Sequence, residues 1–387
     1  MQLSSDDLPM FFDAHHRALA DRLRAIAPEL VALEAPGEDP EDRDETARDR
    51  AAAALLGRHG LFELVVPAAG HPDTRALCLA RELLGYASAR ADSIFAVQGL
   101  GTHPIVLAGS PEQHAALDGF RRGAAIAAFA LTEPEAGSDV AGIRTRAVRD
   151  ADGYTLDGDK LFISNLGIAT FATVFATLDP ALGARGLAAF WVPLDAAGVR
   201  VVPQTAIAPH PIGALELRGV RVPASARIGT DGQGMKLALA TLDAFRVSVG
   251  AAAVGMARRA LDEALAFVTT RHQFGKPLAE QQLVQAHLAD MIVDLDAARL
   301  LVLRAAHRKD TTHERVTTEV SIAKLGATEA AQRVIDRAVQ LFGGRGVMAG
   351  AVVEHLYRAI RPLRIYEGTS EIQRVIIGRA LAQGSQR

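Results

Sequence analysis

The sequence has 387 residues, of which 49% are hydrophobic, and it carries a formal net charge of −3. A chain of this length exceeds one small core, so we expect two or three packed layers or sub-domains. The small net charge and the absence of a long basic run disfavour nucleic-acid binding. The single cysteine, Cys78, excludes a disulfide framework and a cysteine-based zinc site, and its apolar neighbours predict a buried thiol.

The N-terminal stretch MQLSSDDLPMFF lacks the basic segment of a secretory signal. The chain contains no uncharged apolar run of the roughly 18 residues that indicate a membrane-spanning helix. We therefore expect a cytoplasmic protein without a membrane span, and we expect no metal site.

The hydrophobic pattern changes twice along the chain. Helical spacing dominates from about Leu8 to Arg122, where a charged loop, LEAPGEDPEDRDE, separates two predicted helices. From Ala124 to Gly229 the period shortens to that of strands, and Asp157-Gly158 predicts a hairpin turn. Helical spacing then returns, and it predicts long helices at Leu242–His272, Gln281–Asp310 and Thr317–Gly343.

This order of helices, strands and helices predicts an α+β fold. Because no long helices separate the strands, we expect a mainly antiparallel sheet, which differs from the βαβ alternation of a dinucleotide-binding domain. The changes of pattern predict an N-terminal helical domain at residues 1–122, a β domain at 123–230 and a C-terminal helical domain at 231–387.

The stretch RIYEGTSEIQR places a carboxylate in front of a predicted helix. Ser370 and Gln373 have the spacing of a capping box, so Glu367 is expected in the preceding turn, where Gly368 lets the backbone bend. A carboxylate next to Tyr366 could act as a general base if burial raised its pKa. A surface turn with a solvated glutamate fits this local pattern equally well.

A second stretch, ALTEPEAGSDVAG, follows the first predicted strand. Thr132, Gly137 and Ser138 place hydroxyl and amide groups on a turn that can cradle a flavin edge or a pyrophosphate. The nearby carboxylates of Glu133 and Asp139 disfavour a bare phosphate there.

Five stretches resemble, in order, the motifs of the acyl-CoA dehydrogenase family: LTEPEAGSDVAG, KLFISN, RHQFGKPL, QLFGGRG and IYEGTSEIQR. The resemblance runs from roughly Arg81 to the C-terminus. It implies a helical N-terminal domain, a middle β-barrel and a C-terminal four-helix bundle, with FAD held between barrel and bundle in a homotetramer. It also implies α,β-desaturation of an acyl-CoA thioester, with electrons passed to an electron-transfer flavoprotein.

The resemblance assigns roles to individual residues. Those implied to contact FAD within one subunit are Leu131, Thr132, Ser138, Phe162, Ser164 and Thr369. Those implied to reach the FAD of a neighbouring subunit are Arg271, Phe274, Gln340 and Gly344. Those implied to contact the substrate are Arg246, Val249, Tyr366 and Gly368.

Glu367 matches the catalytic base of most of the family, with the β-hydride passing to flavin N5. Some relatives carry the base just before the arginine of an LDxxR stretch, where this chain has Phe245, and we interpret the nearby Asp243 as a structural charge. Two enzymes of the same fold remain as alternatives, an acyl-CoA oxidase and an acyl-carrier-protein dehydrogenase. A non-catalytic flavin- or thioester-binding scaffold is disfavoured because Glu367 is present.

Overall fold

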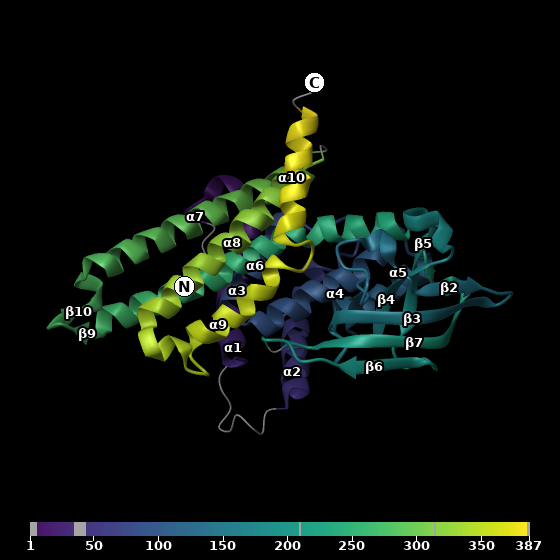
Figure 1. Ribbon diagram of the computed structural model, residues 1–387, viewed down its shortest axis with the longest axis horizontal. Helices are drawn as coiled ribbons and strands as arrows, with labels where there is room; N and C mark the ends of the chain where they lie inside the picture. The colour runs from purple at the N-terminus through teal and green to yellow at the C-terminus, as the bar shows by residue number, and fades with distance from the viewer. Residues whose placement is uncertain (1–5, 35–43, 209, 313–314, 385–387) are drawn as a thin grey trace. The chain divides into compact units, whose positions relative to one another are not determined.

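The computed structural model describes residues 6–34, 44–208, 210–312 and 315–384. These residues form two compact units. The first unit takes the described parts of residues 1–40, 73–92 and 246–387, and the second takes those of 41–72 and 93–245. Helices α4 (Ala89–Ala108) and α6 (Gly234–Thr270) each continue from one unit into the other (Figure 1).

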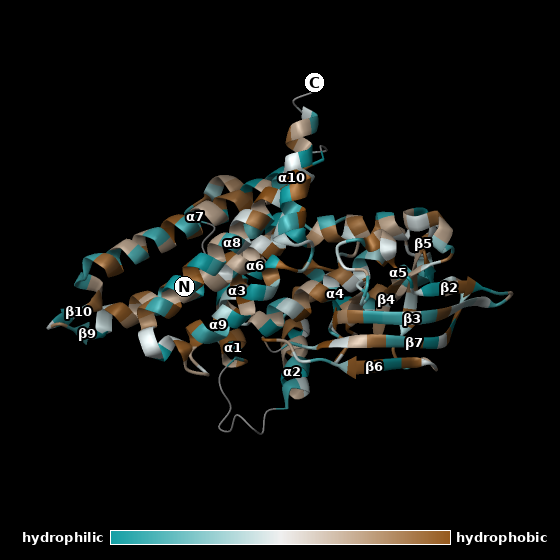
Figure 2. Ribbon diagram, viewed as in Figure 1, coloured by the Kyte–Doolittle hydropathy of each residue, from teal (hydrophilic) through white to brown (hydrophobic). Residues whose placement is uncertain are grey.

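The first unit is helical apart from one short hairpin. Its helices besides parts of α4 and α6 are α1 (Ala14–Ala32), α3 (Thr74–Ala87), α7 (Gln282–Thr311), α8 (Thr317–Phe342), α9 (Val352–Ile360) and α10 (Ser370–Gly384). Helix α8 packs against α7, α9 and α10, and α3 packs against α1 and α7. Hydrophobic and hydrophilic residues alternate along α7 and α8, as expected for helices with one buried face (Figure 2). The hairpin pairs β9 (His272–Gln273) with β10 (Lys276–Pro277).

Two glycines allow α3 and α6 to come into backbone contact. A Cβ atom on Gly85 of α3 would lie 2.2 Å from the carbonyl oxygen of Ala252. Reciprocally, a Cβ atom on Gly255 of α6 would lie 2.0 Å from the carbonyl oxygen of Glu82. Because real Cβ contacts are much longer, any larger residue at either position would push the two helices apart.

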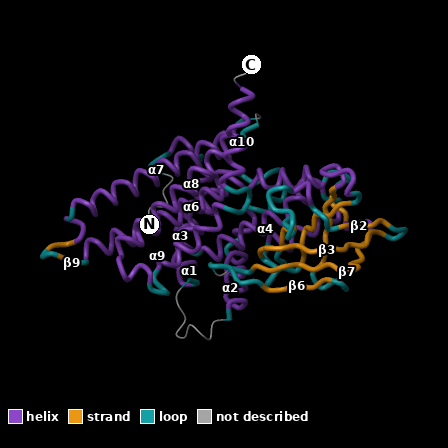
Figure 3. Tube along the Cα trace, in the orientation of Figure 1, coloured by secondary structure: helices purple, strands orange, loops and turns teal. Residues whose placement is uncertain are grey.

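The second unit contains a sheet that is eight-stranded within the described residues (Figure 3). Its strands are β1 (Ala127–Ala130), β2 (Arg146–Arg149), β3 (Gly153–Ser164), β4 (Phe171–Thr177), β5 (Leu187–Pro193), β6 (Val199–Pro203), β7 (Ile212–Pro223) and β8 (Arg227–Ile228). The order is β6-β7-β3-β2-β4-β5-β8, with β1 paired to β4. The pairs of β4 with β1 and β2 are parallel and the other pairs are antiparallel. Buried residues such as Leu156, Phe190 and Leu215 form the core of this sheet.

Two further helices belong to the second unit, α2 (Glu45–Arg58) and α5 (Pro111–Arg121). Each begins at a side-chain cap, because Asp44 accepts from the Ala47 N–H at 2.9 Å and Ser110 forms a capping box with Gln113. The loop predicted before α2 falls largely on residues 35–43, which lie outside the described part of the chain.

The succession of elements confirms the predicted α+β fold class and the mainly antiparallel sheet. Helices extend to Arg121, strands run from Ala127 to Ile228, and helices resume at Gly234. Cys78 is buried, as predicted. The two boundaries between the three predicted domains stay a prediction.

The hairpin predicted at Asp157-Gly158 is wrong. Strand β3 continues through both residues, and its pairing with β7 shifts register between Leu156 and Gly158. The glycine is needed here for close packing, because a Cβ atom on Gly158 would lie 2.5 Å from Oγ1 of Thr145. An Asp-Gly pair thus marks an irregularity within a strand rather than a turn.

Among the described helices, α6 is long and apolar enough to cross a membrane. However, 72% of its most apolar stretch is buried within the protein. That burial is typical of a core helix.

Candidate active site

Backbone strain is concentrated in the segments that the sequence singles out. Among the described residues, four that are not glycine adopt positive φ angles: Phe162 at 58°, Asn165 at 69°, Phe274 at 55° and Glu367 at 54°. This conformation costs on the order of 1–3 kcal/mol for a residue with a side chain, so it persists only where the surroundings impose it. All four residues lie in the KLFISN, RHQFGKPL or IYEGTSEIQR stretch.

Glu367 is buried rather than solvated. It lies in the turn between a 3-10 helix, η8 (Arg361–Arg364), and α10, and it is 9% exposed. Its Oε2 atom has no hydrogen-bond partner among the described residues. Burial raises the pKa of this carboxyl group, against the opposing charges of Arg81, Arg246 and Lys324. A surface turn with a solvated glutamate is therefore excluded.

Buried donors hold the main chain of this turn. The Arg246 Nε atom donates to the carbonyl oxygen of Glu367 at 3.0 Å. The next carbonyl, of Gly368, accepts from Lys324 Nζ at 2.8 Å and from Gln373 Nε2 at 3.0 Å. Two adjacent carbonyls are thus tied to α6, α8 and α10, which fixes the left-handed conformation of Glu367.

The cap of α10 is one residue earlier than predicted. Thr369 Oγ1 accepts from the Ile372 N–H at 3.3 Å, whereas Ser370 is already the first helical residue. The Ser370 hydroxyl instead donates to Glu329 of α8 at 2.6 Å. The predicted capping box of Ser370 is therefore wrong, because its hydroxyl points to a neighbouring helix and not to its own backbone.

A buried ion pair lies in the electrostatic environment of Glu367. Arg81 of α3 donates to both carboxylate oxygens of Asp92 on α4, at 2.9 and 2.8 Å, and to Ser248 Oγ on α6 at 3.1 Å. Burial would lower the pKa of Arg81, but Asp92 holds it above its usual range. Burial also raises the pKa of the Tyr366 hydroxyl, although 36% of the residue as a whole is exposed. The hydroxyl group of Tyr366 is therefore buried, whereas part of its ring is exposed.

Sequence reasoning missed Arg81, Asp92 and Lys324. Burial of these residues could have been suspected from the sequence. Each is a charged residue at a position where the helical pattern requires an apolar one, as in LCLARELL and SIAKLGA. Of the other predicted substrate residues, Arg246 and Val249 are buried on α6.

Three of the predicted FAD residues, Leu131, Thr132 and Ser138, lie on a loop that a buried ion pair attaches to the sheet, and two others, Phe162 and Ser164, lie on β3. Lys160 Nζ of β3 lies 2.7 Å from Glu133 Oε1, and it donates to the Leu131 carbonyl at 3.2 Å. Glu133 also accepts from the N–H groups of Arg144 at 2.7 Å and Thr145 at 3.0 Å. Of the two carboxylates predicted to disfavour a bare phosphate, Glu133 is buried and paired, whereas Asp139 is exposed, so the prediction depends on Asp139.

Both members of this pair are ionised at neutral pH. Burial would raise the pKa of Glu133, but the Lys160 ammonium and the neighbouring donors hold it below its usual range. Burial lowers the pKa of Lys160 to about 8 in spite of Glu133. The lysine thus keeps most of its charge only up to mildly alkaline pH.

The side chains around this pair differ in exposure. Leu131 is buried, Thr132 and Ser164 are half-buried, and Ser138 is exposed. Phe162 is 62% exposed, which is unusual for a large aromatic residue on a strand. Asn165 is buried and donates to the carbonyls of Ile94 at 3.3 Å and Ala127 at 3.0 Å, which anchors the chain directly after Ser164.

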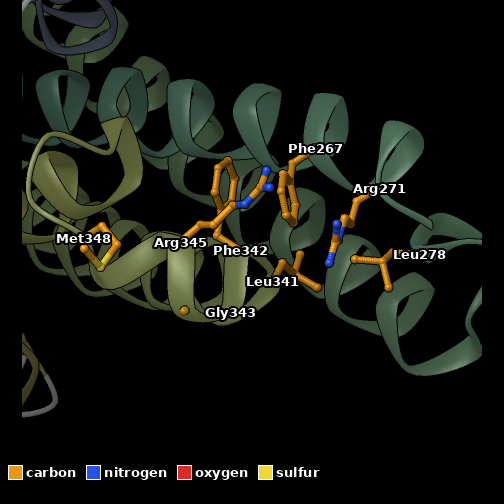
Figure 4. Close-up of a pocket in the computed structure, with 9 residues that line it drawn as sticks. Phe267, Arg271, Leu278, Leu341, Phe342, Gly343, Arg345 and Met348 are labelled. Carbon is orange, nitrogen blue, oxygen red and sulfur yellow. The ribbon is translucent and has the colours of Figure 1, made fainter. Parts of the chain in front are cut away.

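The first unit contains an open pocket of about 540 Å³ between the ends of α6 and α8 (Figure 4). Phe267 and Phe342 stack in it with ring centroids 4.4 Å apart. The Arg345 guanidinium lies 5.9 Å from the centre of the Phe267 ring, and Arg271 lines the same pocket. Aromatic faces beside two guanidinium groups suit a ligand that is both aromatic and anionic, such as a nucleotide.

The pocket brings together two of the four residues predicted for the neighbouring FAD. Arg271 and Gly344 line it, whereas Phe274 and Gln340 do not. Phe274 is at the tip of the β9–β10 hairpin and is 92% exposed, and Gln340 is exposed on α8. Sequence reasoning missed Phe267, Phe342 and Arg345 in this pocket.

The alternative position for a base is apolar. Phe245 is fully buried in the second unit, and its ring lies edge-on to His103 with centroids 5.4 Å apart. This phenylalanine offers no group that could accept a proton.

Three family models together match most of the chain. Residues 13–117, 128–220 and 232–382 match the N-terminal, middle and C-terminal domains of acyl-CoA dehydrogenases. The chain is 38% identical over 374 residues to the Mycobacterium tuberculosis protein named "Probable acyl-CoA dehydrogenase FadE25", covering 95% of each. It is 37% identical over 330 residues to the human mitochondrial short-chain specific acyl-CoA dehydrogenase, covering 83% of this chain and 80% of the relative.

The fold agrees with a solved relative. The structure of butyryl-CoA dehydrogenase from Megasphaera elsdenii superposes with a TM-score of 0.85 and 31% identity, covering 96% of this chain and 99% of the other. Together with the three domain matches, this likeness shows that the chain belongs to the acyl-CoA dehydrogenase family and is an FAD-dependent oxidoreductase.

Proposed function

We propose that this enzyme desaturates an acyl-CoA thioester between Cα and Cβ, with Glu367 as the base, and passes the electrons to an electron-transfer flavoprotein. The observation that carries the proposal is the buried carboxylate of Glu367, with one oxygen that has no hydrogen-bond partner among the described residues. A group held in a strained and desolvated position without a partner is typical of a catalytic residue.

The side chains that line the pocket of the first unit suit part of FAD. The aromatic and guanidinium groups around Arg271 match the adenine and diphosphate portions of such a cofactor. When bound, FAD supplies the acceptor for the hydride that leaves Cβ. The residues that would hold it within one subunit are Leu131, Thr132, Ser138, Phe162, Ser164 and Thr369. The residues that would reach the FAD of a neighbouring subunit in a homotetramer are Arg271, Phe274, Gln340 and Gly344.

Glu367 would take the α-proton of the substrate. The Cα–H bond breaks, its proton moves to the carboxylate, and its electron pair becomes part of the new double bond as the hydride departs from Cβ. Desolvation strengthens the carboxylate as a base, because it raises the pKa of the group. The cations of Arg81, Arg246 and Lys324 oppose that rise in the pKa and favour the ionised form of the carboxylate.

The developing enolate needs hydrogen-bond donors at the thioester carbonyl. The N–H of Glu367 would be one of these donors, so the residue that removes the proton also stabilises the resulting charge. Arg246 and Lys324 hold the carbonyls of the turn and would thereby keep the N–H and the carboxylate oriented together. Tyr366, Val249 and Gly368 would border the substrate.

Glu367→Gln tests the assignment of the base. The change keeps size and polarity but removes proton acceptance, so we expect the rate of flavin reduction by acyl-CoA to fall by about 10²–10⁴-fold. FAD content should remain, because the carbonyl contacts and the Thr369 cap do not involve this side chain. The measurement is single-turnover bleaching of the flavin with the best substrate from a panel of acyl-CoAs.

Glu112→Gln is the matched control. Glu112 is an exposed carboxylate in the first turn of α5, so its loss should leave the rate unchanged. A Glu367→Gln enzyme that reduces its flavin at the wild-type rate would show that the base lies elsewhere. The rate at which O₂ reoxidises the reduced enzyme then separates a dehydrogenase, which reacts slowly, from an oxidase.

A further inference from the structure

Lys324 of α8 is a fully buried cation without an anionic hydrogen-bond partner. Its side chain is inaccessible to solvent, and its ammonium donates to the neutral carbonyl of Gly368 at 2.8 Å. Among the described residues, the carboxylates act on this ammonium through their charge and not through a hydrogen bond. Burying an ammonium ion without a paired counter-ion reduces stability. A lysine at this position therefore needs an explanation other than packing.

The charged groups around Lys324 come from several elements. Glu367 in the turn is the strongest anionic influence on it, and Glu329 on α8 and Glu371 on α10 add weaker ones. Arg246 on α6 is the neighbouring cation. Of these groups, only Glu367 is a buried carboxylate with an unpartnered oxygen.

We propose that Lys324 is a positioning residue for Glu367. Lys324 holds the turn through the Gly368 carbonyl, and its positive charge favours the ionised form of the Glu367 carboxylate. This inference rests on the proposed role of Glu367 as the base. Lys324 itself would touch neither substrate nor cofactor and would act only through the glutamate.

The geometry explains why such a residue is required. Glu367 and Gly368 both have positive φ angles, at 54° and 95°. Two consecutive left-handed residues relax unless their peptide groups are held, and each of their carbonyls accepts from a buried cation. Lys324 therefore contributes both to the direction of the carboxylate and to its charge.

The titration of Lys324 supports this role. Burial lowers the pKa of Lys324 to about 8, although the Glu367 carboxylate opposes the shift. The ammonium is therefore charged at neutral pH and loses its charge in mildly alkaline solution. The same attraction lowers the pKa of Glu367, so removing the lysine charge should raise the pH at which Glu367 ionises.

The test compares three variants by the pH dependence of single-turnover flavin reduction in the FAD-loaded enzyme. Lys324→Met removes both donor and charge, so at pH 7 we expect at least a tenfold slower rate. The acidic limb of its pH–rate profile, where Glu367 becomes protonated, should move to higher pH by about 1 unit. This is the lower end of the pKa shift that a nearby opposite charge produces. Lys324→Gln keeps a donor but drops the charge, so the same shift should come with a smaller loss of rate. Lys324→Arg keeps the charge, so its acidic limb should stay at the wild-type pH.

Val320→Ala is the control for simple destabilisation. Val320 is fully buried one turn before Lys324 on α8, so its truncation weakens the same helix without changing a charge. This variant should unfold more easily yet keep the wild-type pH profile. If Lys324→Met does not fold, the pH of the acidic limb in the Lys324→Gln profile tests the proposal by itself.

Two results distinguish failure of this inference from failure of the proposed function. A wild-type pH profile and rate in Lys324→Met, or a wild-type limb in Lys324→Gln, together with a slow Glu367→Gln enzyme, would overturn the role of Lys324 alone. A fast Glu367→Gln enzyme would overturn the base assignment and the inference with it.

Discussion

Replacement of Lys160 by methionine should destabilise the second unit through its partner Glu133. Methionine fills a similar volume but removes the ammonium that lies 2.7 Å from Glu133 Oε1. The carboxylate is only 6% exposed and would retain two donors, the N–H groups of Arg144 and Thr145. Breaking one side of a buried ion pair costs about 3–5 kcal/mol, and the remaining donors place the expected loss near the lower end, at about 3 kcal/mol.

The stability lost in Lys160→Met should depend on pH and should be larger at neutral pH than at acidic pH. In the wild type the pKa of Glu133 lies below its ordinary value, so its stabilising effect is present above about pH 4.5 and is lost as pH falls through the folded-state pKa. Without Lys160 burial should raise that pKa above the unfolded value. The destabilisation of Lys160→Met should then be largest at neutral pH and shrink as the pH is lowered toward 5.

Urea unfolding of the purified holoenzyme measures the loss, and flavin absorbance in the same samples reports FAD retention. We expect FAD to dissociate earlier in the transition, because Lys160 also holds the Leu131 carbonyl of the loop predicted to contact the flavin. The double variant Lys160→Met/Glu133→Gln removes the unpaired charge and should recover part of the stability. A loss below about 1 kcal/mol for Lys160→Met, or no recovery in the double variant, would show that this ion pair does not stabilise the second unit.

Two further predictions concern packing and assembly. Gly255→Ala should lower the midpoint of thermal unfolding strongly, because its Cβ would lie 2.0 Å from a backbone oxygen of α3, whereas Gly378→Ala on exposed α10 has open space and should be neutral or slightly stabilising. Phe274→Asp should leave the fold of the subunit intact but shift sedimentation toward smaller species with less FAD, because this 92% exposed ring is proposed to contact a neighbouring subunit. Unchanged sedimentation and FAD content would contradict the shared site.

Short motifs were sufficient to locate the turn that carries Glu367, since glycine, a capping hydroxyl and an aromatic neighbour are visible in the sequence. The burial of Glu367 could not be predicted, because it depends on residues of α3, α6 and α8 that are distant along the chain. The exact cap was also ambiguous. Thr369 and Ser370 carry equivalent hydroxyls, and only the position of Glu329 on another helix determines which one caps.

The missed residues share a physical cause. Patterns of helical spacing treat charged residues as solvent-facing, so they give no reason to expect that Arg81 and Lys324 are both fully buried. Their partners are a carboxylate eleven positions away for Arg81 and a turn carbonyl 44 positions away for Lys324. Conversely, the Asp157-Gly158 pair looked like a turn because local pattern does not reveal the close approach of Thr145.

The turn at Glu367 is fixed through its carbonyl groups, and this arrangement separates the shape of the site from the identity of the side chain. A different residue at this position would inherit the same main-chain geometry, since Arg246, Lys324 and Gln373 donate to carbonyl groups of the turn. Glutamate itself is an unfavourable choice for folding here, because both the left-handed backbone and the buried charge reduce stability. Selection for stability alone would therefore remove it, so its presence is what the proposed role as a catalytic base predicts.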